Sequence, residues 1–194
     1  MNAPVNASTN AVAARQPVAS WQIRAEASAD AAAVALLTAE SFGPGRFAKS
    51  AYRLREGVDP VPGLGFVAVE DGVLKGSVRF WPILVGGVET LLLGPLAVQT
   101  GQRGRGIGIA LMQAGIEAAH AGPWPGILLV GDEPYYAKVG FSRLPPGRVK
   151  FPGPVDPDRI LGLSLKAGGL LNLSGHIRRA HIDHGVTADG AGVG

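Results

Sequence analysis

The chain has 194 residues, of which 46% are hydrophobic and 17% charged, and its formal net charge is +3. This length and composition favour one folded unit with a sizeable core, and so modest a charge gives little support for a nucleic-acid partner. The sequence has no cysteine, which excludes disulfides, thiolate zinc sites and a cysteine nucleophile, and no run reaches the roughly twenty apolar residues of a membrane span.

The first part of the chain is expected to be a tail followed by a strand and two helices. Residues 1–19 are rich in Ala, Asn, Ser and Pro and lack a basic start, which predicts a disordered tail rather than a signal peptide. Trp21–Arg24 has strand composition, and Ser28 or Asp30 can cap an alanine-rich helix that ends at a Gly-Pro-Gly break. The apolar residues that approximate the buried face of this helix are Ala33, Leu36, Leu37 and Phe42. A second helix is predicted over roughly Arg46–Glu56.

Strand signals dominate the middle of the chain. Gly65–Val69 and Val73–Trp81 have strand composition, and the Glu-Asp-Gly between them is a strong signal for a tight hairpin. Two continuous apolar runs, Leu91–Val98 and Ile127–Val130, are typical of buried strands. A last apolar run, Ile160–Leu165, follows a proline-rich stretch and predicts a final strand.

The most informative stretch is Leu91–Leu111, where a buried strand is followed by a glycine-rich arginine loop and then by helical periodicity. The residues that recur at helical spacing are Ile107, Leu111, Ala114 and Ala118. The loop is therefore expected at a helix N-terminus, where free backbone N–H groups and the helix dipole favour an anion. Three glycines let the backbone approach that anion, and two arginines add donors suited to phosphate. These residues are Gly104, Gly106, Gly108, Arg103 and Arg105.

Two better-known phosphate loops do not fit this stretch. A P-loop would end in Gly-Lys followed by Ser or Thr, whereas Gly106 is followed by Ile107 and Gly108. A dinucleotide fingerprint would need a glycine where Ile109 stands and an acidic residue about twenty positions later, near Trp124, and the sequence has neither.

Arg103, Gly106 and Gly108 instead spell Arg-x-x-Gly-x-Gly directly after a strand, which closely resembles the pyrophosphate-binding motif of the GNAT family of acetyl-CoA-dependent N-acyltransferases. The resemblance implies an α/β fold with a central mixed, mostly antiparallel twisted sheet flanked by helices, in the order β-α-α-β-β-β-α-β-α-β over residues 20–166. Residues 167–194 would then form an extension whose glycine-rich end is expected to be disordered. The cofactor contacts that the resemblance implies are Leu96, Ala97, Val98, Arg103, Gly104, Arg105, Gly106, Ile107, Gly108 and Tyr135.

In the GNAT family the strand before this loop carries a bulge and splays from its neighbour, so that the pantetheine arm can pair with the exposed backbone. Gly94-Pro95 is the predicted bulge, because proline cannot donate to a ladder and glycine tolerates irregular dihedral angles. The resemblance also implies that a backbone N–H near Leu96 polarises the thioester carbonyl.

A second motif follows the next predicted strand. Tyr136, Gly140 and Phe141 match the family's Tyr-x-x-x-Gly-Phe, and the preceding Gly-Asp with the Tyr-Tyr pair looks most like the YhbS-type subgroup. The resemblance implies that Tyr136 protonates the departing coenzyme A thiolate. This chemistry is reasonable, because a phenol of pKa about 10 is protonated at neutral pH and a thiolate of pKa roughly 8.5 can accept its proton.

The base that would take a proton from an amine acceptor is less well defined. Glu89, at the start of the loop-bearing strand, is the candidate, and Glu70 and Asp71 are the other available acids. Because leucines fill the deeper positions of that strand, where a polar base would be expected, a second interpretation stays open. It is a non-catalytic acyl-CoA-binding or regulatory protein with a GNAT fold.

The partners that the resemblance implies are acetyl-CoA and an amine of a small molecule or peptide, attacked directly, in a cytoplasmic protein that can form a homodimer. No nucleic acid, membrane or metal partner is expected; the histidines of residues 181–184 have no regular structure beside them to form a metal site. Arg46, Arg53 and Arg55 lie on or near the helices that line the acceptor side in GNAT folds. Two interpretations stay open: an anionic acceptor, or a helix whose exposed arginines form an ordinary solvated face.

Overall fold

The computed structural model describes residues 20–45 and 50–180. The strands are β1 (Gln22–Ala25), β2 (Gly65–Glu70), β3 (Val73–Val85), β4 (Val88–Val98), β5 (Gly126–Val130), β6 (Ser142–Arg143), β7 (Val149–Lys150), β8 (Ile160–Ser164) and β9 (Gly175–Arg179). The helices are α1 (Ala31–Phe42), α2 (Ser50–Arg53), α3 (Ile107–His120) and α4 (Glu133–Tyr136), and short 3-10 turns lie at Ser28–Asp30, Thr100–Gln102, Ala137–Val139 and Pro157–Arg159.

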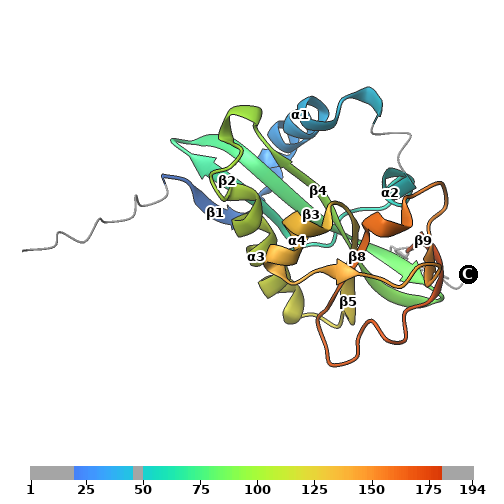
Figure 1. Ribbon diagram of the computed structural model, residues 1–194. Coiled ribbons are helices and arrows are strands. Elements are labelled where there is room, and N and C mark those ends of the chain that lie inside the picture. The colour runs from blue at the N-terminus through green and yellow to red at the C-terminus, as the bar shows by residue number, and fades with distance from the viewer. Residues whose placement is uncertain (1–19, 46–49, 181–194) are drawn as a thin grey trace, which may run out of the picture.

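The strands form a mixed sheet that is mostly antiparallel, as predicted (Figure 1). Its order is β1-β2-β3-β4-β5-β8-β6, and β9 pairs with the far end of β3 and with β7. The β4–β5 and β7–β9 pairs are parallel and the other pairs are antiparallel. At the predicted β2–β3 hairpin, Asp71 and Gly72 have φ of 52° and 75°, as a tight turn between twisted strands requires.

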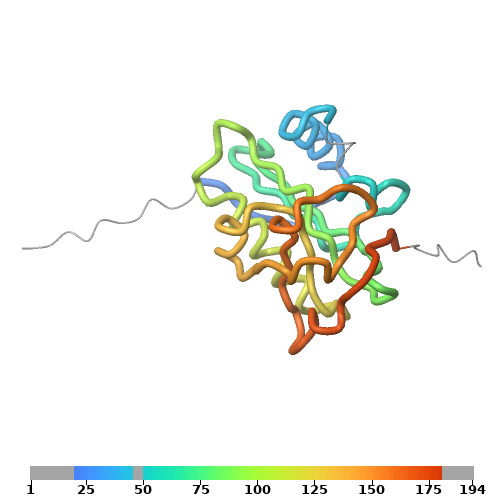
Figure 2. The backbone as a smooth tube through the Cα atoms, turned by 45° about the vertical axis from the view of Figure 1, so that its right-hand side comes forward, coloured from blue at the N-terminus to red at the C-terminus, as the bar shows by residue number. Residues whose placement is uncertain are grey.

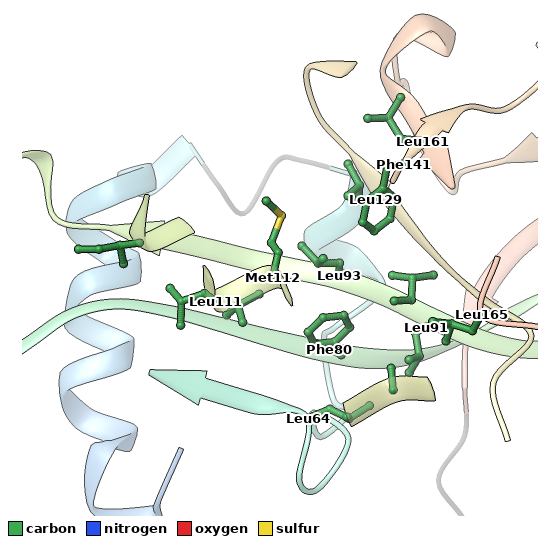
Figure 3. Close-up of a cluster of buried hydrophobic side chains, with 14 of the residues drawn as sticks. Leu64, Phe80, Leu91, Leu93, Leu111, Met112, Leu129, Phe141, Leu161 and Leu165 are labelled. Carbon is green, nitrogen blue, oxygen red and sulfur yellow. The ribbon is translucent and has the colours of Figure 1, made fainter. Parts of the chain in front are cut away.

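Two hydrophobic clusters hold helices and loops against the sheet. Helix α3 covers one face, where its Leu111 and Met112 pack with Phe80 of β3 and Leu93 of β4 (Figure 3). The close approach of α3 needs a small residue, because a Cβ on Gly115 would lie 2.2 Å from the Phe80 ring. Helix α1 lies on the other side of β3 and β4 from α3 (Figure 1).

The second cluster contains buried residues from β3, β4 and β5, from the segment just after α2, and from the C-terminal part of the chain. These are Leu54, Ile83, Val85, Leu92, Leu128, Leu144, Val149, Ile160, Leu173 and Ile177. The end of the described chain runs beside the β3–β4 turn (Figure 2). There, Ile177 of β9 pairs with Val85 and belongs to this cluster. The sequence predicts a GNAT domain over residues 20–166 and an extension over residues 167–194; in the structure this extension contributes β9 to the sheet.

Both predicted helix faces differ from the observed ones. In α1 the buried residues are Val34 and Leu37, and Leu36 is 62% exposed. In α3 the buried residues include Met112, Gly115 and Ala119 along with the predicted Ile107 and Leu111. An alanine-rich helix has a weak apolar stripe, so its rotation is set by the sheet that it covers. Helix α2 is shorter than predicted, although residues 46–49 of that prediction lie outside the described residues.

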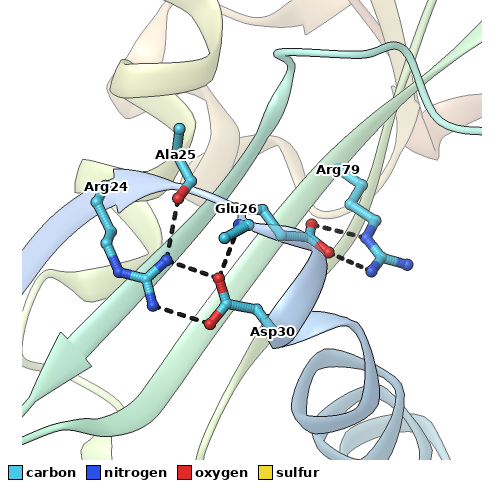
Figure 4. Close-up of polar contacts among 6 residues, drawn as sticks. Arg24, Ala25, Glu26, Asp30 and Arg79 are labelled. Carbon is cyan, nitrogen blue, oxygen red and sulfur yellow. Dashed lines mark hydrogen bonds and ion pairs between the residues drawn. The ribbon is translucent and has the colours of Figure 1, made fainter.

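Ion pairs fix the entry of the chain into α1. Arg24 forms a two-pronged pair with Asp30, which also accepts a hydrogen bond from the backbone N–H of Ala27 (Figure 4). Beside it, Arg79 of β3 forms a two-pronged pair with Glu26. The Arg24 guanidinium is the main cause that lowers the pKa of Asp30 to about 2.

Candidate active site

Strands β4 and β5 separate part-way along their length. Their parallel pairing covers Leu91 with Ile127 and Leu92 with Leu128, and no pairing follows beyond these residues. At the closed end of the gap, Thr90 of β4 bonds to β5: its Oγ1 donates a 2.6 Å hydrogen bond to the carbonyl of Gly126. The backbone of β4 from Leu93 onward therefore faces a gap on the β5 side, as the sequence predicted.

The predicted bulge lies at the mouth of this gap. Between the pairs Val78–Leu96 and Phe80–Leu93, strand β4 has one more residue than β3, which places the irregularity at Gly94-Pro95. Gly94 has φ +120°, a conformation that favours glycine. Because a bulge redirects the strand locally, it turns the backbone around Leu96 away from regular pairing.

The glycine-rich loop leads directly into α3. Gly104 and Gly106 have φ of 80° and 82°, and Gly106 is the N-cap of the helix. The first N–H groups of α3, from Ile107 onward, therefore have no partner within the helix and are available to an anion. The Ile107 side chain is buried in the core, so only its backbone is available. Ala97 is buried in β4, and Val98 is the last residue of the strand.

The two arginines of the loop differ in their surroundings. Arg105 forms a two-pronged ion pair with Glu70 of β2, at 2.7 and 3.0 Å, and also contacts Ser20 and Gln102. This guanidinium is the main cause that lowers the pKa of Glu70 to about 2. Within the described residues, no carboxylate lies within ion-pair distance of Arg103, which is exposed.

The two tyrosines of α4 point to different parts of the site. The Tyr135 hydroxyl lies against the first turn of α3, because a Cβ on Gly108 would be 2.2 Å from it. Tyr136 lines a cavity beside the β4–β5 gap, and a Cβ on Gly131 would lie 2.2 Å from its ring. Burial raises the pKa of the Tyr136 hydroxyl to about 12, with smaller contributions from Tyr135 and Asp132.

The cavity has a volume of about 410 Å³, which is within the usual range for small-molecule sites. Its wall is formed by the C-terminal half of α1, by α2 with Arg55, by the separated parts of β4 and β5, by Tyr136 of α4 and by the segment before β8. The lining residues with ionisable or hydroxyl groups are Thr38, Ser50, Tyr52, Arg55, Asp132, Tyr136, Asp156 and Arg159. Arg55 and Tyr136 are candidates from the sequence, but no sequence pattern indicates that Asp132, Asp156 and Arg159 line the same cavity.

The acids named from the sequence lie elsewhere. Glu89 is exposed near the start of β4 and is not among the residues that line the cavity. It stands five residues before Gly94, which is about 17 Å along a strand. Glu70 is engaged by Arg105, and neither it nor Asp71 lines the cavity. The structure therefore does not bring Glu89, Glu70 or Asp71 together with Tyr136.

Neither a metal-binding cluster nor a membrane-spanning helix is present among the described residues. Within residues 20–45 and 50–180, no group of three or more His, Asp or Glu side chains is arranged to hold a metal ion. Over the same residues, no helix combines the length and the apolar character needed to cross a membrane. The histidine-containing segment at residues 181–184 lies outside the described residues.

Comparison with known proteins connects this geometry to a family. The model of the Acetyltransferase (GNAT) domain matches residues 62–143, which include the separating strands, the glycine-rich loop and Tyr136. A protein named as an uncharacterized N-acetyltransferase, YhbS of Escherichia coli K12, is 34% identical over 123 residues, which cover 62% of this chain and 72% of the relative. The chain belongs to the GNAT family. The predicted resemblance to its YhbS-type members is thereby confirmed, and the family makes the chain an acyltransferase.

Solved structures agree with this assignment. The crystal structure of E. coli YhbS in complex with CoA has a TM-score of 0.69 and 27% identity, with 85% of this chain and 92% of that chain covered. A GNAT family acetyltransferase of Brucella melitensis in complex with acetyl-CoA has a TM-score of 0.54 and 29% identity, with 74% and 95% covered. The predicted GNAT fold is therefore confirmed.

Proposed function

We propose that this GNAT protein transfers the acetyl group of acetyl-CoA to an amine by direct attack. The observation that carries the proposal is the juxtaposition of three features: the β4–β5 gap, the glycine-rich N-terminus of α3, and Tyr136 in the cavity beside the gap. Two similar GNAT proteins have been solved with CoA or acetyl-CoA, which supports the same class of donor here.

The residues present fit such a donor. An anionic pyrophosphate suits the free N–H groups that follow Gly106, and the left-handed Gly104 and Gly106 leave the loop backbone open to it. Arg103 is the side-chain donor proposed for this group, whereas Arg105 acts chiefly by holding the loop to Glu70. The unpaired backbone of β4 around Leu96 is suited to an extended pantetheine arm.

In the proposed reaction, bound acetyl-CoA supplies an acetyl group activated as a thioester, with a thiol as the leaving group. A backbone N–H near Leu96 would stabilise charge that develops on the carbonyl oxygen. Tyr136 would donate its proton to the departing sulfur, and its raised pKa keeps that proton in place at neutral pH. Asp132 and Asp156 line the cavity and replace Glu89 as the proposed acceptors of the amine proton.

Exchange of Tyr136 for phenylalanine tests this assignment. Tyr136→Phe is expected to lower kcat by about a hundredfold, with the affinity for acetyl-CoA unchanged, because only the transferable proton is removed. Tyr135→Phe is the matched control. The Tyr135 hydroxyl lies against the first turn of α3, so its removal should leave turnover at saturating acetyl-CoA near that of wild type. The measurement is amine-dependent thiol release together with calorimetric titration of acetyl-CoA.

Two outcomes would contradict the proposal. Unchanged kcat in Tyr136→Phe would remove the acid role from this residue. Saturable acetyl-CoA binding without amine-dependent thiol release from any acceptor would favour the non-catalytic acyl-CoA-binding alternative. Cytoplasmic location, homodimer formation and the absence of a nucleic-acid partner stay predictions.

A further inference from the structure

The cavity wall contains one arginine whose surroundings differ from those of the other partly buried arginines. Arg55 follows α2 and lines the cavity next to the β4 bulge, where its Nη2 lies 3.0 Å from the position that a Cβ on Gly94 would take. The guanidinium carbon is 6.0 Å from the centre of the Trp81 ring. The positive charge is thus held at the mouth of the β4–β5 gap.

This charge has no carboxylate partner among the described residues. Arg55 takes part in no ion pair there, and its enclosed Nε has no hydrogen-bond acceptor. By contrast, the half-buried Arg79 is held by both oxygens of Glu26, and the cavity's other arginine, Arg159, is 3.2 Å from Asp132. Burial lowers the pKa of Arg55 to about 10, so it still carries its charge at neutral pH.

A cation that is enclosed without a counter-ion is destabilising for the protein alone. A ligand that brings an anion to this position would supply the missing partner. The planar guanidinium matches a carboxylate in a two-pronged arrangement, and such charge-assisted hydrogen bonds are the stronger ones. The unpaired state of Arg55 therefore points to an anionic group on whatever enters the cavity.

The position of Arg55 limits how far that anion can be from the reacting nitrogen. Arg55 Nη2 and the backbone N of Leu96 lie 3.0 Å and 3.7 Å from the same point, the position that a Cβ on Gly94 would take. The guanidinium is therefore close to the backbone N–H that is proposed to polarise the carbonyl. An amine that attacks there while its carboxylate contacts Arg55 has only a few bonds between the two groups. A cavity of about 410 Å³ suits an acceptor of this size.

We propose that the acceptor is a small amino acid, whose carboxylate binds Arg55 while its amine attacks the acetyl group near Leu96. This inference rests on the proposed acetyltransferase function and adds the substrate class. In the transfer, the C–N bond forms as the C–S bond breaks, the amine proton passes to a carboxylate of the cavity, and the thiolate takes the proton of Tyr136. Proton exchange with solvent then restores the carboxylate and the Tyr136 hydroxyl. Arg55 takes no part in these bond changes and acts as a specificity-determining residue.

The test compares the proteinogenic amino acids and β-alanine with their primary amides as acceptors, using acetyl-CoA and thiol release. At least one amino acid should react with a kcat/KM about tenfold or more above that of its amide, because the amide lacks the charge-assisted contact. In Arg55→Met that preference should be lost, mostly through a higher KM for the amino acid, and Arg55→Lys should retain part of it. Arg178→Met, which removes an exposed arginine of β9, should keep the wild-type preference.

Two further measurements separate a substrate-binding role from a structural one. Removal of an unpaired enclosed charge should leave the Tm of Arg55→Met equal to or above that of wild type, whereas loss of a structural residue would lower it. The affinity of Arg55→Met for acetyl-CoA should match wild type, since Arg55 is not in the α3 loop. A lower Tm together with an unchanged acid-to-amide preference would overturn the inference.

The remaining outcomes distinguish the inference from the function on which it rests. The amino acid assignment would be overturned, with the acetyltransferase function intact, by either of two results. One is equal kcat/KM for the amino acids and their primary amides, and the other is faster acetylation of a neutral peptide amine than of any amino acid. Acetyl-CoA binding without thiol release from any amine would overturn the function itself, and the inference with it.

Discussion

The position of the Tyr136 ring depends on its packing against Gly131, the residue directly after β5. A Cβ on Gly131 would lie 2.2 Å from Cε2 of the Tyr136 ring, so Gly131→Ala must displace that ring. We expect kcat to fall nearly as far as in Tyr136→Phe, because a shift of about 1 Å can cost a hundredfold in rate. Gly45→Ala is the control, since a Cβ there would meet nothing within 4 Å. Wild-type kcat in Gly131→Ala would show that the ring position is not critical.

The raised pKa of Tyr136 has a consequence for pH dependence. A group that acts as an acid loses its function when the pH rises through its pKa, and burial raises the pKa of Tyr136 to about 12. Deprotonation of Tyr136 should therefore cause no fall in kcat at or below pH 10, although an ordinary tyrosine has a pKa of about 10. A decline near pH 8 that vanishes in Tyr136→Phe would contradict this environment for the hydroxyl.

The two arginines of the loop before α3 have different proposed roles: Arg103 binds the ligand, and Arg105 holds the loop in place. Arg103 has no ion pair within the described residues, whereas Arg105 is neutralised by Glu70. We expect Arg103→Gln to weaken acetyl-CoA binding about tenfold, through loss of a charge-assisted contact. Arg105→Gln should weaken it less and lower the Tm slightly, because its ion pair is on the surface. Calorimetric titration at low and high salt checks both, and a larger loss from Arg105→Gln would reverse the two roles.

The strand–loop–helix element was also the part of the site that the sequence predicted best. The bulge at Gly94-Pro95 and the turn at Gly106 are local features of this element, and each depends on residue types with restricted backbone roles. Tyr136 lies outside it, in α4, and was found through the family motif. Glu89 could not be placed from sequence in the same way. It opens the correct strand, but the cavity lies beside the other end of that strand.

On the scale of the whole molecule, β9 closes one end of the fold. Its Ile177 is 2% exposed and lies in the second hydrophobic cluster. Ile177→Ala should cost about 2–5 kcal/mol and lower the Tm by roughly 5–15 °C, as measured by thermal unfolding. Substitution of the neighbouring exposed His176 by alanine should change little. An unchanged Tm in Ile177→Ala would place the folded unit's end before β9, at the boundary predicted from sequence.

Sequence patterns could not predict β9 or the acceptor side of the cavity, for a common physical reason. The Gly-His-Ile-Arg-Arg run of β9 buries one large apolar side chain and has too short a pattern to indicate a strand. The cavity wall brings Arg55, Asp132 and Arg159 together from separate segments, and this arrangement arises only when α2 and the loop before β8 pack around the β4–β5 gap. Family motifs predicted the proposed acetyl-CoA side of the site, whereas tertiary packing forms the side proposed for the acceptor.

Calorimetric titration of acetyl-CoA into the wild-type protein and into Gly106→Asp tests the central claim most directly. The donor site predicts saturable binding to wild type and none to Gly106→Asp, which places a carboxylate at the N-cap of α3. Gly147→Asp is the matched control, because Gly147 also has a positive φ and open space around it, and it should bind like wild type. Equal binding by wild type and Gly106→Asp, or no binding by wild type at millimolar acetyl-CoA, would contradict the account.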